Sequence, residues 1–251
     1  MSKKFGLQLY TVRENLGSAE EIEETFSKIK SIGYDTIQTY SGIKSVSPKK
    51  LGNLAKNAKL EVCGAFVDFE MMKTDGEKSN ETALALGTKD LGTSWMSFEN
   101  EDEIISLLDG INRSAENLAP YGIKFSYHNH YKEFERYKDA TAFDFLMNNT
   151  PADKVSFCFD TYWAQLGGVD VREYIRRLSG RLDILHLKDY CIKNGNIVFA
   201  PVGDGNLFWD GIIKEAENAG VKHYVVEQDN CGDMDVFEAI ERSREFLEKY
   251  N

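Results

Sequence analysis

The segment that decides the fold is 155-VSFCFDTYWAQLGGVDVREYIRRLSGRLDILHL-187. It begins with an apolar run at 155–160, continues through an amphipathic stretch at 171–178, and ends with a second apolar run at 184–187. Short unbroken apolar runs are typical of strands that are buried on both faces. Because a helix lies between the two runs, the strands must be joined by a parallel crossover, and the segment predicts a βαβ unit.

The same alternation continues outward from this segment in both directions. Further apolar runs predict strands at 5–11, 36–39, 60–67, 93–98, 123–128 and 224–227. Amphipathic stretches predict helices at 48–58, 77–86, 101–118, 141–147, 207–219 and 234–249. One more helix is expected between Ser18, which forms a capping-box pattern with Glu21, and Gly33.

These elements form eight strand–helix units without a long low-complexity linker. Eight parallel units favour a closed barrel over an open doubly wound sheet. We therefore predict an α/β protein with one (β/α)₈ TIM barrel, which forms a single domain over residues 1–251.

The composition is that of an ordinary soluble globular protein, with 42% hydrophobic and 28% charged residues. A formal net charge of −11 argues against a nucleic-acid partner, because binding phosphates requires a basic face. The sequence shows no signal-peptide pattern and no apolar stretch of the length that spans a membrane. Its four cysteines show no CxxC spacing. We therefore expect a cytoplasmic protein with reduced thiols and no membrane partner, and the possibility of a homo-oligomer stays open.

Polar residues gather at the expected carboxyl ends of the strands, where barrels of this type build their active sites. Three of the four histidines fall at two of these ends. Each histidine alone is more often a hydrogen-bonded structural residue than a ligand. Together with Asp160 and Glu227, however, they predict nitrogen and oxygen ligands that converge on one divalent ion, such as Mn²⁺, Co²⁺, Zn²⁺, Fe²⁺ or Mg²⁺. A thiolate zinc site is not expected, since no cysteine lies at these ends.

Six fragments, which extend over nearly the whole chain, resemble a known family. They are GLQLYTVRE (6–14), SYHNHYKEFE (126–135), FDTYWAQLGGVDV (159–171), GRLDILHLKDY (180–190), PVGDGNLFW (201–209) and VVEQD (225–229). Their combination resembles the sugar isomerase and epimerase branch of the xylose isomerase-like barrels. That group includes D-tagatose 3-epimerase, hydroxypyruvate isomerase, inosose dehydratase, 3-dehydroshikimate dehydratase and relatives of endonuclease IV.

The resemblance implies a specific set of metal ligands. The family's aspartate on strand six matches Asp160, its histidine on strand seven matches His186, and its glutamate on strand eight matches Glu227. The family usually has a second glutamate at the end of strand five, but here that place falls on His-Asn-His. We assign the fourth ligand to His128, with His130 as the alternative, since residues two apart on a strand share a face. A purely structural role for this loop is the competing interpretation.

This departure affects the expected mechanism. In relatives with both glutamates, the pair acts as acid and base in proton transfer at carbon. Here Glu227 would be one catalytic base, and His128, His130, Glu133 or a metal-bound hydroxide would have to supply the second.

Other residues at the strand ends are candidates for binding substrate. Lys188 could bind a carboxylate or phosphate or polarise a carbonyl, although a structural ion pair with Asp160 or Asp189 is an equal alternative. Gln8 and Tyr10 could bind sugar hydroxyls or simply close the barrel floor. Trp163 is expected in an apolar wall against a sugar ring.

The leading functional prediction is a divalent-metal-dependent isomerase or epimerase of a sugar or keto-sugar, which abstracts a proton next to a metal-bound carbonyl. The alternative is a metal-dependent lyase or dehydratase acting on a keto-sugar, an inosose or a 3-keto-glycoside. An AP endonuclease is less favoured, because Phe66 stands where relatives often have a histidine for a further metal. A non-catalytic sugar-binding barrel is the remaining alternative.

Overall fold

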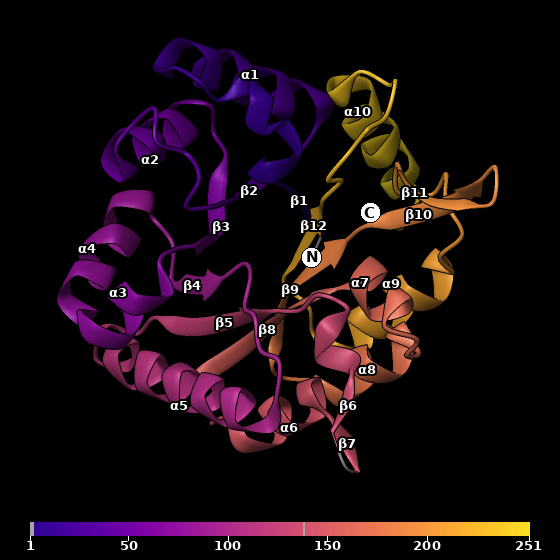
Figure 1. The fold of residues 1–251 in the computed structure, drawn as a ribbon. Helices are drawn as coiled ribbons and strands as arrows, with labels where there is room; N and C mark the ends of the chain where they lie inside the picture. Colours follow the sequence, from indigo (N-terminus) through magenta and orange to yellow (C-terminus); the bar gives the residue numbers. More distant parts are fainter. Residues whose placement is uncertain (1–2, 138) are drawn as a thin grey trace.

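Eight parallel strands close into a barrel in the computed structural model, which describes residues 3–137 and 139–251 (Figure 1). Around the barrel the strands follow the order β1, β12, β9, β8, β5, β4, β3, β2. Their bounds are β1 Lys4–Gln8, β2 Thr36–Thr39, β3 Glu61–Phe66, β4 Asp90–Thr93, β5 Lys124–His128, β8 Val155–Asp160, β9 Leu182–Leu187 and β12 His223–Val226. The predicted (β/α)₈ TIM barrel is confirmed.

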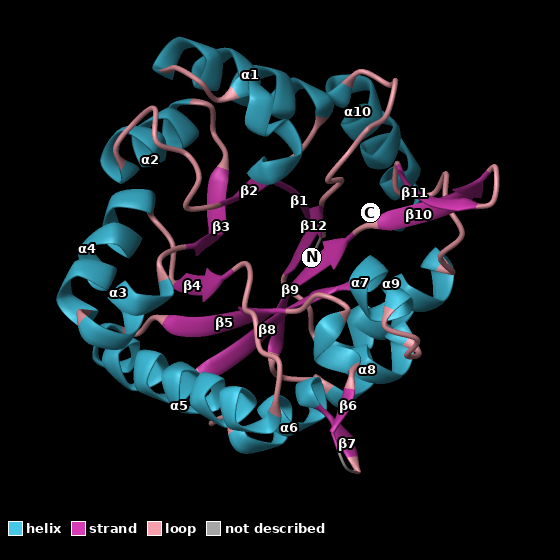
Figure 2. Ribbon diagram, viewed as in Figure 1, coloured by secondary structure: helices cyan, strands magenta, loops and turns pink. Residues whose placement is uncertain are grey.

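Helices form a ring around the outside of the barrel (Figure 2). They are α1 Ala19–Ile32, α2 Pro48–Asn57, α3 Phe69–Thr74, α4 Gly76–Leu86, α5 Glu101–Leu118, α6 Ala142–Asn149, α7 Thr161–Leu166, α8 Val171–Arg177, α9 Trp209–Ala219 and α10 Val236–Leu247. Ser18 caps α1 by accepting a hydrogen bond from the Glu21 backbone at 3.1 Å. The Glu21 carboxylate bonds to the Gly17 backbone rather than to that of Ser18, so the predicted capping box is shifted by one residue. No helix in the described part of the chain is both long and apolar enough to cross a membrane.

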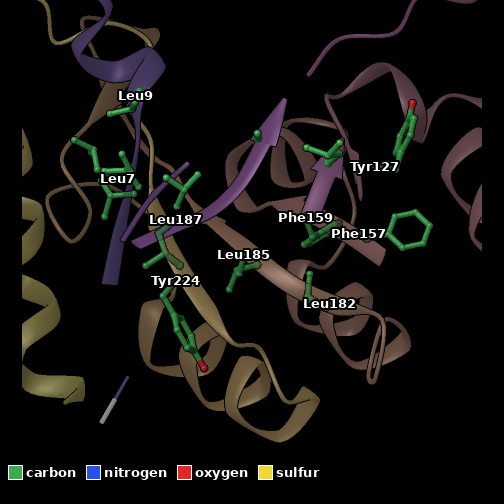
Figure 3. Packing of buried hydrophobic residues seen from close by; sticks show 14 of the residues in the cluster. Leu7, Leu9, Tyr127, Phe157, Phe159, Leu182, Leu185, Leu187 and Tyr224 are labelled. Atoms are coloured by element: carbon green, nitrogen blue, oxygen red, sulfur yellow. The ribbon is translucent and has the colours of Figure 1, made fainter. Parts of the chain in front are cut away.

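The main core lies between the barrel wall and the helices (Figure 3). On β8, Phe157 and Phe159 belong to this core, while Ser156, Cys158 and Asp160 occupy the alternate positions and face the barrel interior. Polar side chains therefore fill much of the interior, and Ser156 there donates to the buried Asp90 carboxylate. This alternation directs Asp160 inward at the end of the strand.

Two predicted strands were wrong in their bounds. Strand one ends at Gln8 rather than at residue 11, because the Gln8 side chain accepts a hydrogen bond from the Tyr10 backbone and starts the 3₁₀ helix η1, Leu9–Asn15. Strand four is Asp90–Thr93 rather than 93–98, and the residues from Ser94 onward form a loop. Four elements were not foreseen as strands: the hairpin of β6 (Arg136–Tyr137) with β7 (Ala140–Thr141), and that of β10 (Asp189–Lys193) with β11 (Asn196–Ala200). The short helices α3 and α7 and the 3₁₀ helices η2 (Ala119–Tyr121), η3 (Lys132–Phe134) and η4 (Glu248–Tyr250) were also not foreseen.

Candidate metal and substrate site

Four buried side chains converge at the carboxyl ends of adjacent strands. His128 ends β5, Asp160 ends β8, His186 lies near the end of β9, and Glu227 directly follows β12. Each offers one ligand atom, and these four atoms all lie within 4.8 Å of one another. Two nitrogens and two carboxylate oxygens form a donor set suited to a divalent transition metal.

Each histidine is oriented by a contact that one of its ring nitrogens makes, which leaves the other nitrogen for the cluster. His128 Nδ1 lies 3.2 Å from the carbonyl oxygen of Cys158, so this nitrogen is the donor and Nε2 keeps its lone pair. His186 Nε2 contacts Oε1 of Gln38, so Nδ1 is the nitrogen that would bind a metal once it has lost its proton. Supporting acceptors of this kind commonly orient metal-binding histidines.

The carboxylate of Asp160 is held in the same way. Its Oδ1 accepts a hydrogen bond from the Trp163 backbone at 2.9 Å, and its own backbone N–H donates to Asn129 Oδ1 at 2.9 Å. Among the described residues, Asp160 Oδ2 and His186 Nδ1 have no hydrogen-bond partner. His186 Nδ1 lies 2.9 Å from Glu227 Oε2 and 3.7 Å from Asp160 Oδ2. Buried polar atoms without a partner are costly, and a cation among them would satisfy both.

The surroundings of the cluster shift the pKa values of the two histidines in opposite directions. Burial, together with the nearby His186, holds the pKa of His128 well below its ordinary value, so its ring is neutral. Burial would also lower the pKa of His186, but Cys158 and Glu227 raise it well above the ordinary value. Burial opposes ionisation of Glu227, yet Lys188 and His186 bring the pKa of Glu227 well below its usual range. The metal-free site therefore holds a proton on His186 that a metal must displace.

Lys188 lies within this acidic cluster. Its Nζ is 2.8 Å from Asp229 Oδ1, 3.1 Å from Glu227 Oε2 and 3.6 Å from Asp160 Oδ2. Burial disfavours its charge, but Glu227 and Asp160 raise the pKa of Lys188, so the cation is retained. Asp189, the other predicted partner, instead accepts hydrogen bonds from the loop at 203–209, including Trp209 Nε1.

A cavity of about 300 Å³ opens above the cluster. Of the predicted site residues, it is lined by Gln8, Tyr10, His128, His130, Trp163, Lys188 and Glu227. Asp160 and His186 lie beneath its floor, fully buried. The remaining lining residues are Tyr40, Phe66, Ser94, Trp95 and Asp229.

Sequence reasoning missed Tyr40, Ser94 and Trp95 as lining residues. Tyr40 directly follows β2, and Ser94 and Trp95 directly follow β4. The rule that the site lies at strand ends would have found Trp95 if strand four had been placed correctly.

His130 and Glu133, both proposed as bases, lie in different surroundings. The His130 ring packs between Trp95, with ring centroids 4.5 Å apart, and Trp163, at 5.1 Å. Its Nδ1 has no partner among the described residues, and burial lowers the pKa of His130 to about 4. Both carboxylate oxygens of Glu133 are engaged, one by Tyr127 Oη at 2.9 Å and one by the His130 backbone at 3.0 Å. Glu133 does not line the cavity, and it supports the loop that carries His130.

Gln8 belongs to the network that holds His186. Its Nε2 donates to Gln38 Oε1 at 3.0 Å, and the same oxygen contacts His186. Gln38 was not predicted as a site residue. The available signal was its polar side chain within a buried strand.

Comparison with known proteins identifies relatives over most of the barrel. The family model described as xylose isomerase-like TIM barrel matches residues 26–250. An inosose dehydratase of Geobacillus kaustophilus (strain HTA426) is 35% identical over 89 residues, which are 36% of this chain and 28% of that protein. The inosose dehydratase of Geobacillus thermodenitrificans (strain NG80-2) is 28% identical over 147 residues, 51% of this chain and 49% of that protein. The matches thus span about half or less of these relatives.

Solved structures share the fold over nearly the full chain. A sugar phosphate isomerase/epimerase from Parabacteroides distasonis ATCC 8503 has a TM-score of 0.85 at 24% identity, covering 98% of this chain and 94% of that one. L-Ribulose 3-epimerase has a TM-score of 0.74 at 13% identity, with 98% and 93% covered. The IolI protein with a bound zinc atom has a TM-score of 0.72 at 16% identity, with 96% and 95% covered.

Proposed function

Because this chain belongs to the xylose isomerase-like TIM barrel family, we propose that it is a divalent-metal-dependent isomerase or epimerase of a sugar or keto-sugar. The observation that carries the proposal is the cluster of His128, Asp160, His186 and Glu227, whose four ligand atoms lie within 4.8 Å of one another and include two buried atoms without a hydrogen-bond partner among the described residues. The zinc atom bound to the structurally similar IolI protein supports a metal in this fold. Mn²⁺, Co²⁺, Zn²⁺, Fe²⁺ and Mg²⁺ all suit nitrogen and oxygen ligands.

When bound, the ion would polarise a substrate carbonyl and so acidify the neighbouring C–H bond. Glu227 lines the cavity, and its lowered pKa keeps the carboxylate ready to accept that proton. Lys188 lines the same cavity and would donate a hydrogen bond to the oxygen that gains negative charge.

We assign the second acid–base role to His130. His128 is occupied as a ligand and as a donor to Cys158, and both Glu133 oxygens accept hydrogen bonds away from the cavity. His130 lines the cavity, and its buried Nδ1 has no hydrogen-bond partner among the described residues. A neutral ring with a free nitrogen can accept a proton and return it to the other carbon or the other face.

Elimination of water or an alcohol is the second candidate. The sequence relatives reported above are inosose dehydratases. His128 replaces the family's second glutamate, so Glu227 and Asp229 are the carboxylates among the described residues that line the cavity, and Asp229 is paired with Lys188. A single base together with a metal suffices for elimination. Product mass separates the two reactions, because isomerisation conserves mass and elimination does not.

We also propose that the enzyme is cytoplasmic and acts on a small molecule without a nucleic-acid or membrane partner. The four cysteines are free, which agrees with a reducing compartment, and the net charge of −11 opposes phosphate-backbone binding.

The shared proton transfer can be tested by hydrogen exchange. Metal-loaded protein is incubated in D₂O with inosose and with L-ribulose, and deuterium is expected at the carbon beside the carbonyl in the converted sugar. Glu227→Gln keeps the shape of the side chain but removes the proton acceptor, so exchange should fall by at least about 100-fold even with excess metal. Glu61→Gln, which alters a carboxylate at the opposite end of the barrel, is the matched control and should retain exchange. For a sugar that is turned over, the absence of both exchange and a substrate deuterium isotope effect would contradict the proposal.

A further inference from the structure

The residues that line the cavity come from two sets of consecutive strands, which differ in the charge that they contribute. The metal-ligand half comes from β5, β8, β9 and β12, which are consecutive around the barrel. The other half comes from β1 to β4, also consecutive, and presents Tyr10, Tyr40, Phe66 and Trp95 together with the neutral Gln8 and Ser94. We refer to Tyr10, Tyr40, Phe66 and Trp95 as the aromatic half. Among the described residues, those of β1 to β4 and the segments that follow them contribute no charged side chain to the cavity lining.

Two rings of the aromatic half are unusually exposed. The Trp95 side chain is 62% exposed and that of Tyr10 is 39% exposed, although both border a cavity. Each is held by a neighbouring ring: Trp95 packs edge-on against His130, and Tyr10 packs edge-on against Tyr40 with centroids 5.4 Å apart. A single exposed aromatic residue is unremarkable, but several around one cavity mark a surface that binds an apolar partner.

The charges around the cavity disfavour a phosphate. Lys188 is the only cation among the described lining residues, and three carboxylates surround it. Arg13 lies near the mouth, but its guanidinium stacks on Tyr10 at 4.4 Å and donates to the backbone oxygens of Tyr10 and Asp229. Even with a divalent ion to neutralise Asp160 and Glu227, Lys188 keeps Asp229 as its partner at 2.8 Å. Among the described lining residues, no cation is therefore free of carboxylate partners to balance the charge of a phosphate dianion.

We propose that the aromatic half is a subsite for an uncharged aromatic substituent of the sugar, and that Trp95 determines this specificity. The substrate class is then a keto-glycoside with an aromatic aglycone, which keeps the carbonyl that the proposed reaction needs, rather than a free sugar or a sugar phosphate. The placement of the sugar ring over the metal ligands rests on the proposed function, whereas the aromatic subsite rests on its own residues.

Equilibrium binding to the metal-loaded protein tests the subsite without turnover. The probes are phenyl β-D-glucopyranoside, methyl β-D-glucopyranoside, glucose and glucose 6-phosphate, measured by titration calorimetry. The phenyl glucoside is expected to bind about tenfold more tightly than the methyl glucoside, because a stacked aromatic pair adds roughly that factor. Glucose 6-phosphate should bind no more tightly than glucose.

Substitutions test whether Trp95 is the residue that gives the preference for the phenyl glucoside. Trp95→Ala should weaken the binding of phenyl glucoside more than that of methyl glucoside and so remove the roughly tenfold preference, while Trp95→Phe should keep most of it. Phe208→Ala is the matched control, since Phe208 is also 62% exposed but does not line the cavity.

Three results would overturn the subsite: equal or unmeasurable binding of the two glucosides, tighter binding of the 6-phosphate, or an unchanged preference in Trp95→Ala. Because no reaction is required, phenyl selectivity without proton exchange would refute the proposed function and leave the subsite standing. Proton exchange without phenyl selectivity would refute the subsite and leave the proposed function standing.

Discussion

At the scale of single residues, a proton on His186 would govern how the proposed site takes up metal. Its raised pKa reflects Cys158 and Glu227, which outweigh the effect of burial. His128, only 4.7 Å away between ring centroids, has its pKa lowered and offers its lone pair without competition from protons. One of the two imidazole ligands is thus ready for metal, and the other must first lose its proton.

We expect metal affinity to rise with pH through the neutral range. Below the pKa of His186 one proton leaves for each ion bound, so the dissociation constant should fall about tenfold per pH unit. The gain should level off once His186 is neutral in the free protein. Titration of Zn²⁺ or Mn²⁺ at several values between about pH 6 and 8 measures this slope.

His223→Gln is the control for that experiment, because His223 lies at the opposite end of the barrel and should leave the slope unchanged. A metal dissociation constant that does not vary with pH would show that His186 carries no proton in the free protein.

At the scale of elements, the close contact between β4 and β5 depends on Gly92. A Cβ at this position would lie 2.2 Å from the backbone oxygen of Ser126, which the barrel wall does not allow to move. The strand therefore contains a glycine where an apolar residue would have signalled its presence.

Gly92→Ala should destabilise the barrel by roughly 2–3 kcal/mol or more, as in other overpacked cores, and this is measurable by urea unfolding. Gly87→Ala provides the comparison, because that Cβ would meet no atom within 4 Å and only the positive φ of 80° resists it, at a cost of about 1 kcal/mol. Equal losses in the two variants would argue against a steric origin.

The same glycine explains where sequence reasoning failed. Apolar runs located seven of the eight barrel strands, because strands buried on both faces need such runs. The short β4, with Gly92 at its centre, gave no such signal, and the more apolar residues up to Phe98 were taken for it. The strand-end rule brought out His128, Asp160, His186 and Glu227, which lie together, but it could not show Gln38, whose contact with His186 spans 148 positions in the chain.

At the scale of the whole molecule, the two ends of the barrel differ in chemistry. The end opposite the candidate site has a hollow of about 320 Å³ lined by Asp90, Lys124, Asp183 and His223, among others. Asp90 is buried there, and one of its oxygens has no hydrogen-bond partner among the described residues. Burial, and next the charge of Asp183, raise the pKa of Asp90 to about 7.

This buried carboxyl should make the fold less stable as the pH rises. Between the ordinary pKa of 3.8 and the folded value of about 7, the folded state holds the proton that the unfolded state releases. Its stabilising contribution is therefore complete at about pH 4 and is lost by about pH 7. Asp90→Asn removes this dependence and should raise the unfolding free energy at pH 8 by up to about 4 kcal/mol relative to wild type, with little difference near pH 4.

Urea unfolding of both proteins at the two pH values gives the comparison. Asp183→Asn serves as the counterexample, because that carboxylate is ion-paired with Lys124 and Lys222 and its pKa is lowered. Its replacement should cost stability at pH 8. Similar effects of the two substitutions would rule out the role assigned to Asp90.

The division of the cavity into two consecutive sets of strands also bears on how such enzymes diversify. The rings of the aromatic half lie at residues 10–95 and the ligands at residues 128–227, with α5 between them. Recombination at α5 would replace the aromatic half, which we propose selects the substrate. It would keep the proposed metal ligands, which would carry out the reaction. Among the contacts that cross that junction, Gln38 of β2 orients His186 of β9. A chimaera assembled from two relatives should thus inherit its chemistry from the C-terminal parent and its substrate range from the N-terminal parent, provided that the donor of β2 carries a hydrogen-bond acceptor at the position of Gln38.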